Sequence, residues 1–142
     1  MYEDYTRQTL PPRDYRELLG SAACVFNSNN AFVIENILGS EGGGEYSWCD
    51  LIDKESGWLL PVVEATITKE AGSSIADLFK LVVYKRNRIL HSFQVTGQDG
   101  EQVLRTKERA GGEQFDITRE YLLEFIADNQ RLSDELYDYR GH

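Results

Sequence analysis

The segment YKRNRILHSF places Arg86, Asn87 and His91 close together in the chain. A histidine exchanges a proton near neutral pH, and an arginine offers two-point hydrogen bonding to phosphate oxygens. These groups have the chemistry needed to cleave RNA without a metal, in a reaction where the 2′-hydroxyl attacks phosphorus and leaves a 2′,3′-cyclic phosphate. The three residues therefore define a candidate catalytic site.

Arg86 occupies a position where helical spacing calls for an apolar residue. The apolar stripe around it is formed by Ile75, Leu78, Phe79, Val82, Ile89, Leu90 and Phe93. Burying an unpaired guanidinium is costly, so Arg86 needs a carboxylate, a phosphate or an interface that an anion can reach. A structural interpretation pairs it in the core with Glu35, Glu64 or an acid of the last helix. The functional interpretation gives it a phosphate.

His91 does not share a helix face with Arg86, because five residues turn a regular helix by about 140°. Tyr84, Asn87, Arg88 and His91 instead form a polar ridge, in which Tyr84 lies about one helical turn before Asn87 and His91 about one turn after it, near Arg88. Two copies of this ridge, facing each other across a twofold axis, would bring histidines and arginines together.

The small number of histidines also favours a second copy, unless a different group takes one of the two proton-transfer roles. Apart from His91, the sequence contains only the C-terminal His142. If histidines supply both the acid and the base, the second must come from another chain. We therefore predict a homodimer whose interface includes residues 73–93.

The segment RNRILH, Arg86 to His91, resembles the R-N-x-x-x-H form of the Arg-x(4–6)-His signature of the HEPN superfamily. The resemblance implies a helical, usually dimeric domain that in many members is a metal-independent endoribonuclease of toxin–antitoxin, phage-defence or RNA-processing systems. It implies catalytic roles for Arg86 and His91, with Asn87 as their polar neighbour. Many relatives lack activity, so a non-catalytic protein-interaction or nucleotide- or RNA-binding module is the alternative.

The net charge of −9 disfavours nucleic-acid binding for the chain as a whole, but the basic side chains are concentrated. Residues 80–109 carry seven basic and three acidic side chains. The candidate RNA-binding residues are Tyr84, Lys85, Arg88, Arg105, Lys107 and Arg109. Each of these charges can equally be a solvated surface residue without a function.

The rest of the chain has the spacing of one mainly helical domain over residues 1–142. Residues 1–11 are expected to form a loose arm, followed by a long helix over 13–39 with a weak point at Asn27–Asn30. Short helical segments are expected near Trp48 and over 59–67, although VVEATITK within 62–69 also alternates like a strand.

Ser73 or Ser74 is expected to cap the helix that carries the motif, and Thr118 the final helix. Turn signals at 96–100 and 111–112 predict a small antiparallel hairpin or three-stranded meander over 94–117. The predicted fold is therefore mainly α, a bundle of about four to five helices with a β insertion before the last helix, and the resemblance of the motif implies that this bundle is HEPN-like.

Other features narrow the expected partners. No apolar stretch reaches the length of a membrane span, so we expect a cytoplasmic protein without a membrane partner. Cys24 and Cys49 lie in apolar, helix-like contexts and are expected to be buried thiols. Without a CxxC spacing, the histidines are too few for a zinc site, and no cofactor is expected. The expected partners are an RNA substrate, a second copy of the chain and an antitoxin or other partner protein.

Overall fold

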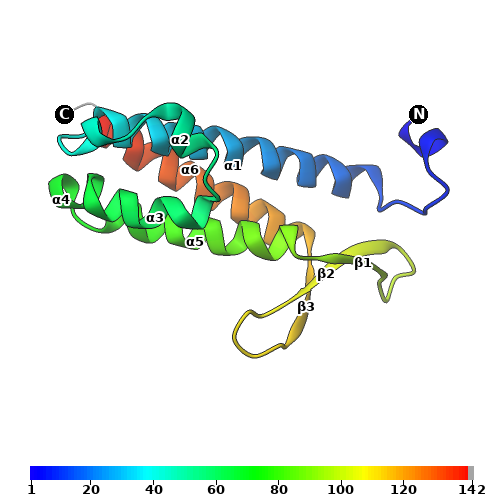
Figure 1. The fold of residues 1–142 in the computed structure, drawn as a ribbon. Coiled ribbons are helices and arrows are strands. Elements are labelled where there is room, and N and C mark those ends of the chain that lie inside the picture. The colour runs from blue at the N-terminus through cyan, green and yellow to red at the C-terminus, as the bar shows by residue number, and fades with distance from the viewer. Residues whose placement is uncertain (141–142) are drawn as a thin grey trace.

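A computed structural model describes residues 1–140, which form a helical bundle with a small antiparallel sheet at one end (Figure 1). The helices are α1 (Arg13–Gly39), α2 (Trp48–Ile52), α3 (Ser56–Ala65), α4 (Ile67–Ala71), α5 (Ser74–Leu90) and α6 (Arg119–Arg140), with 3-10 turns η1 (Tyr2–Tyr5) and η2 (Gly43–Glu45). The strands are β1 (Phe93–Thr96), β2 (Gln102–Lys107) and β3 (Gln114–Ile117). This confirms the prediction of a mainly helical fold with a β insertion before the last helix.

Four of the helices surround the hydrophobic core. Helix α6 lies along both α1 and α5, and α3 packs on α5 (Figure 1). Apolar residues at three- and four-residue spacing face this centre, as expected for helices with one buried face. The rings of Phe26 in α1 and Phe125 in α6 stack with their centroids 6.2 Å apart. Other fully buried residues are Val33, Ile34, Ile37, Leu59, Phe79, Val82, Leu122, Leu132 and Leu136.

The polar run Asn27–Asn30 does not split α1. The buried Asn29 donates through Nδ2 to the carbonyl and the Oδ1 of Asn129 in α6, at 2.7 and 3.0 Å. Asn30 Oδ1 accepts a hydrogen bond from Ser56 Oγ in α3 at 3.0 Å. The predicted weak point is wrong, because these amides bond to neighbouring helices instead of competing for the backbone of their own.

The segment VVEATITK, residues 62–69, which alternates like a strand in the sequence, lies in the helices α3 and α4. Helix α3 continues through the exposed Pro61 to Ala65. Thr66 then leaves the helical conformation, with φ −121° and ψ −79°, and separates α3 from α4. The Thr66 hydroxyl donates to the Val62 carbonyl at 2.7 Å, which gives an acceptor near the end of α3 a donor.

The predicted helix caps have different outcomes. The backbone N–H of Tyr121 donates to Thr118 Oγ1 at 3.0 Å, so the cap of α6 is confirmed. At the start of α5, Ser73 makes no side-chain cap, and Ser74 Oγ donates to the Glu135 carboxylate at 2.6 Å. The predicted serine cap is wrong, because the Ser74 hydroxyl joins α5 to α6 instead.

The predicted three-stranded meander is confirmed, with β2 between β1 and β3 and both pairings antiparallel. Tyr15, near the start of α1, fastens this sheet to the bundle. Its hydroxyl accepts from the Leu104 N–H at 3.1 Å and donates to the Ile117 carbonyl at 2.6 Å. Leu104 and Ile117 face each other in the β2–β3 pairing. One buried hydroxyl therefore bonds both strands.

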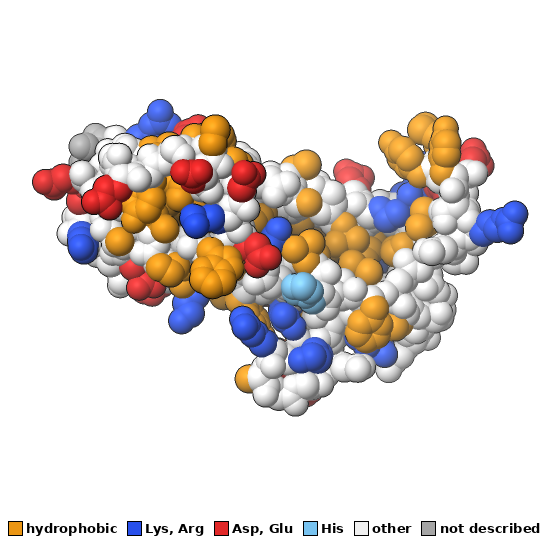
Figure 2. All heavy atoms as spheres, viewed as in Figure 1, with side chains coloured by type: hydrophobic (Ala, Val, Ile, Leu, Met, Phe, Trp, Pro, Cys, Tyr) orange, Lys and Arg blue, Asp and Glu red, His pale blue; other side chains and the backbone are white. Residues whose placement is uncertain are grey.

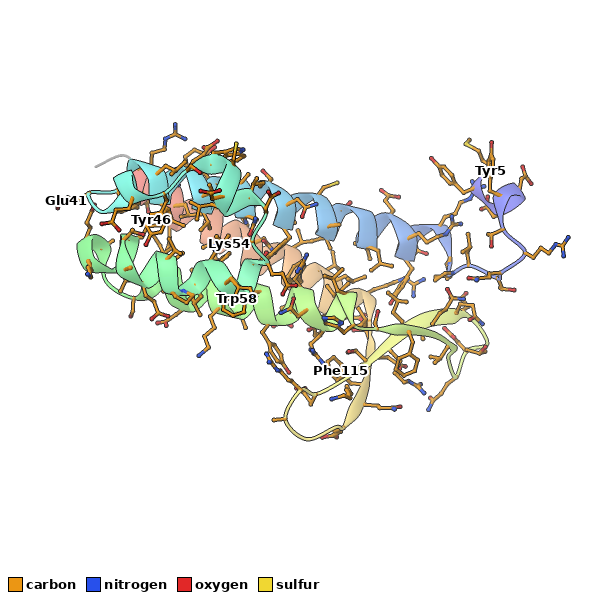
Figure 3. All side chains as sticks on the ribbon, viewed as in Figure 1. Tyr5, Glu41, Tyr46, Lys54, Trp58 and Phe115 are labelled. Carbon is orange, nitrogen blue, oxygen red and sulfur yellow. The ribbon has the colours of Figure 1, made fainter. Side chains whose placement is uncertain are left out.

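We expect Tyr15→Phe to lower the free energy of unfolding by about 2 kcal/mol, because it leaves the polar groups of two strands without a partner in a buried place. Urea unfolding followed by circular dichroism measures this loss. Tyr5→Phe is the matched control, since Tyr5 lies on η1 in the N-terminal arm (Figure 3) and its side chain is 89% exposed. Equal midpoints for the two variants would contradict the role given to the Tyr15 hydroxyl.

The N-terminal arm, residues 1–11, contains η1 and is held at two points. Glu3 Oε1 lies 3.0 Å from Arg16 Nη2 in α1. Gln94 Nε2 of β1 donates to the Thr9 carbonyl at 2.6 Å. The arm expected to be loose therefore has contacts with both α1 and the sheet.

Cys24 and Cys49 are both exposed, so the prediction of buried thiols is wrong. Both residues have apolar neighbours in sequence, but their own positions on α1 and α2 face outward. Within residues 1–140, no helix combines the length and the apolar character required to cross a membrane. The described part of the chain also contains no group of three or more His, Cys, Asp or Glu side chains placed to hold a metal ion.

Candidate functional site

Arg86 lies near the C-terminal end of α5 and is half-buried. Its guanidinium carbon is 5.3 Å from the centroid of the Phe26 ring in α1, and Nη1 donates to Asn87 Oδ1 at 3.3 Å. Among residues 1–140, no carboxylate oxygen lies within 4.0 Å of an Arg86 nitrogen. Glu35, one of the acids expected to pair with it, lies 3.6 Å from Arg140 instead. The charge of Arg86 is therefore not neutralised by an acid of the described chain.

Glu64, the other named acid, is exposed on α3 and forms no ion pair within residues 1–140. The interpretation of Arg86 as a core arginine paired with a carboxylate is therefore wrong. The aromatic ring of Phe26 takes the place of the acid, because the face of the ring attracts a cation.

His91 follows the last residue of α5 and has an exposed side chain. Its backbone N–H donates to the Asn87 carbonyl at 2.9 Å, and its own carbonyl accepts from Thr106 Oγ1 of β2 at 3.0 Å. The sheet thus fixes the backbone of His91 and leaves the imidazole free. Figure 2 shows this histidine on the surface, with Lys and Arg side chains gathered near it.

Arg86 and His91 leave the end of α5 in different directions. The five-residue step turns a helix by about 140°, and His91, with φ −93° and ψ 48°, has already left the helical conformation. Arg86 is turned toward α1, whereas His91 is exposed beside the sheet. No hydrogen bond joins them within the described residues. One chain therefore brings both groups to the same end of α5 without a direct bond between them.

The polar ridge is partly covered by the chain's own β2–β3 connection. Arg88 is only 8% exposed, and its Nη1 donates to the Lys107 carbonyl at 2.7 Å. The Tyr84 hydroxyl donates to the Glu108 carboxylate, and this bond is the main reason why the pKa of Tyr84 is raised. The guanidinium of Arg88 also lies over the Tyr84 ring, at 5.8 Å. Tyr84 and Arg88 thus hold the hairpin against α5, and these contacts occupy the polar groups that were expected to bind RNA.

Lys85 is directed toward α6. Its Nζ lies 2.5 Å from the Asp128 carboxylate and 3.2 Å from that of Glu124, and its side chain is 13% exposed. Asp128 is 3% exposed, so this is a largely buried ion pair. The ammonium group of Lys85 is therefore occupied by the carboxylates of α6, and not by RNA as predicted.

The basic residues of the hairpin differ in their surroundings. Arg105 Nε lies 2.7 Å from Asp116 Oδ1 on the neighbouring strand, and this bond raises the pKa of Arg105. Lys107 and Arg109 are exposed and form no ion pair within residues 1–140. Lys107 and Arg109 are therefore the predicted RNA-binding residues whose charges stay available.

Two apolar residues near His91 differ from their predicted placement on the buried stripe of α5. Leu90 is 57% exposed and Phe93 is 48% exposed. The helix ends between them, so the stripe no longer faces the bundle at these positions. The sequence signal for this is the change from helical to alternating periodicity after Phe93, because it indicates that the chain leaves the helical bundle near this point.

An acidic groove of about 740 Å³ lies at the opposite end of the bundle from the sheet. Glu70 in this groove accepts from the Glu41 N–H at 2.5 Å and from the Tyr139 hydroxyl at 2.8 Å, and these bonds lower the pKa of Glu70. Burial, followed by the bond to Glu70, raises the pKa of Tyr139 to about 12. The groove is also lined by the carboxylates of Glu35, Glu135 and Asp138, which would repel phosphate, so this groove is not a candidate for RNA.

No protein-family model, no curated protein and no solved structure matches the chain. Support for a function therefore comes from the RNRILH motif and from the contacts of its side chains.

Proposed function

We propose that the chain is a HEPN-like domain that cleaves RNA without a metal at the C-terminal end of α5. The observation that carries this proposal is the position of Arg86, on the ring of Phe26 and with no carboxylate of residues 1–140 beside it. A guanidinium whose charge is not neutralised by an acid keeps donors for two phosphate oxygens. The exposed His91 near it supplies a group that exchanges protons.

The reaction is a transesterification at phosphorus. The 2′-oxygen forms a bond to phosphorus while the bond from phosphorus to the 5′-oxygen of the next nucleotide breaks. One histidine takes the proton of the 2′-hydroxyl, and an acid delivers a proton to the leaving 5′-oxygen. Arg86 stabilises the negative charge that develops on the phosphorus-bound oxygens. The products are a 2′,3′-cyclic phosphate and a 5′-hydroxyl.

The proposal includes a homodimer, because the described residues contain one histidine and the reaction uses two proton-transfer groups. A second copy of the chain would supply another His91. The 57% exposed Leu90 lies directly before His91 in the chain, and covering such a side chain favours association. A twofold arrangement around this point would place the two Leu90 side chains and the two histidines near one another.

We expect RNA cleavage to continue at an unchanged rate in excess EDTA, because Arg86 and His91 supply the charge and the proton transfer that a metal would otherwise supply. The measurement is the rate of fragment formation from a single-stranded RNA, with and without EDTA. An all-2′-deoxy strand of the same sequence is the control and should stay intact, since it lacks the nucleophile. Cleavage that stops in EDTA, or that also cuts the deoxy strand, would overturn the mechanism.

The alternative function is a HEPN-like module that binds RNA or a partner protein without cutting it. The different directions of Arg86 and His91 at the end of α5 favour it, since catalysis requires both groups at one phosphate. If the wild-type protein binds RNA but does not cleave it, the non-catalytic binding function is the correct one.

A further inference from the structure

We propose that the outer face of the three-stranded sheet is a binding surface for single-stranded RNA, on which Phe93 stacks against a base. This inference rests on the proposed function, because it assigns the surface that would hold the substrate strand next to His91. The occupant is a single strand of nucleic acid, recognised by an exposed aromatic ring and neighbouring cations.

The pairing of the strands defines which side chains share this face. Phe93 is paired with Arg105, and Arg105 is paired with Asp116, across β1, β2 and β3. Residues directly opposite one another lie on the same side of a sheet. Thr106 and Ile117, which alternate with them, are fully buried against the bundle. Phe93, Arg105 and Asp116 therefore lie on the side that faces away from the core.

Phe93 is the residue of this face that points to a ligand. Its side chain is 48% exposed at the start of β1. An exposed ring offers its π-face to a base, and such stacking tolerates any base. Phe93 lies two residues after His91, so a base on its ring places the adjoining phosphates near the proposed catalytic group.

The charges of the face suit a phosphate backbone. Arg105 is bonded to Asp116 through Nε, which orients the guanidinium across the sheet, and its side chain stays 34% exposed. Lys107 lies two residues further along β2 and therefore on the same side, where it is exposed. Figure 2 shows Lys and Arg side chains beside the histidine and a hydrophobic side chain on the same surface. An exposed ring with positive groups beside it is an arrangement that binds single-stranded nucleic acid.

A double-stranded RNA does not fit this surface, because its bases are stacked inside the helix and cannot lie on Phe93. A protein partner would cover the ring but would not need the cations beside it. The combination of an aromatic ring with Arg105 and Lys107 therefore favours a single strand.

The test is binding of a fluorescently labelled oligodeoxyuridine of about 12 nucleotides, which lacks the 2′-hydroxyl and stays uncut. We expect Phe93→Ala and Phe93→Leu to weaken binding by about tenfold or more, and Phe93→Trp to bind at least as tightly as wild type. Tyr137→Ala is the matched control, since Tyr137 is a 64% exposed aromatic on α6, and it should not change affinity. Wild-type affinity in Phe93→Ala, or an equal loss in Tyr137→Ala, would overturn the proposal.

A second readout detects the stacking itself. In a Trp48→Phe, Trp58→Phe background, the single tryptophan of Phe93→Trp should lose fluorescence when the oligodeoxyuridine is added. A duplex of the same length should leave it unchanged, and quenching by both would overturn the choice of a single strand. Light scattering should show the same dimer mass for wild type and Phe93→Ala, because the proposed twofold contact is centred on Leu90 and His91 and leaves the Phe93 ring uncovered. A lower mass for Phe93→Ala would make this face an interface between copies of the chain and would overturn the proposal.

The outcomes for the sheet and for the catalytic proposal are separate. Loss of oligodeoxyuridine binding in Phe93→Ala, with no cutting of RNA by the wild type, supports the binding surface and rejects cleavage. RNA cutting with unchanged binding in Phe93→Ala rejects the binding surface and leaves the proposed ribonuclease standing.

Discussion

Replacing Arg86 by alanine is expected to abolish RNA cleavage, with a loss of at least about 100-fold in rate, while the protein stays folded. The loss follows from removing the group that stabilises charge on the phosphorus-bound oxygens. The protein should lose no more than about 1 kcal/mol of stability, the size of a cation–π contact, because no carboxylate of residues 1–140 pairs with Arg86 and none is left unpaired. Cleavage and thermal unfolding are measured on the same preparations.

Two further variants separate the charge of Arg86 from its shape. Arg86→Lys keeps a positive charge but loses the planar fork that grips two oxygens, so it should cleave RNA almost as poorly as Arg86→Ala. Arg7→Ala removes an exposed arginine of the N-terminal arm, away from the candidate site, and should keep the wild-type catalytic rate. If Arg86→Ala unfolds far below the wild type, Arg86 is a structural residue and its catalytic assignment fails.

Replacing Lys85 by methionine is expected to cost about 3 kcal/mol of stability. Asp128, which is 3% exposed, would lose the ammonium group 2.5 Å away and keep only Arg131, whose side chain is 61% exposed. Removing one member of a buried ion pair leaves an uncompensated charge, which is more harmful than removing both. Chemical denaturation of Lys85→Met measures the effect.

The control for this prediction is Lys80→Met, which changes an exposed lysine of the same helix and should have little effect on the unfolding midpoint. The double variant Lys85→Met, Asp128→Leu should recover part of the lost stability, because the carboxylate is then absent as well. A Lys85→Met protein as stable as Lys80→Met would show that the pair contributes little, and would return Lys85 to the candidates for RNA binding.

Local chemistry made much of the fold predictable. Thr118 was recognised as a cap because a hydroxyl before a helix bonds its first turn, and the meander was recognised from its turns and alternation. The strand-like stretch within α3 and α4 stayed ambiguous, because short apolar runs suit both structures. Asn29 was misjudged because its amide bonds to Asn129, a hundred residues away, and no local pattern shows such a partner.

The candidate site was only partly predictable, because its side chains also contact residues that are distant in the sequence. Spacing showed that Arg86 lies on the inner stripe, but the Phe26 ring beside it comes from another helix. Lys85 and Arg88 look like surface charges in the sequence, whereas Asp128 of α6 and the Lys107 carbonyl of the hairpin bind them. Phe93 looked like a core residue because the helical spacing of apolar residues continues to it, whereas α5 ends at Leu90. Partners from distant segments decide these cases.

The measurement that tests the central claim most directly is the chemistry of the RNA ends left by wild type and by His91→Ala. His91 is exposed at the end of α5, so its removal should leave the fold unchanged and lower cleavage by about 100-fold or more. Mass spectrometry of a single-stranded RNA incubated with wild type in EDTA should detect fragments that end in a 2′,3′-cyclic phosphate, and these should be nearly absent with His91→Ala. Intact RNA with a folded wild type, or equal cutting by both proteins, would contradict the account.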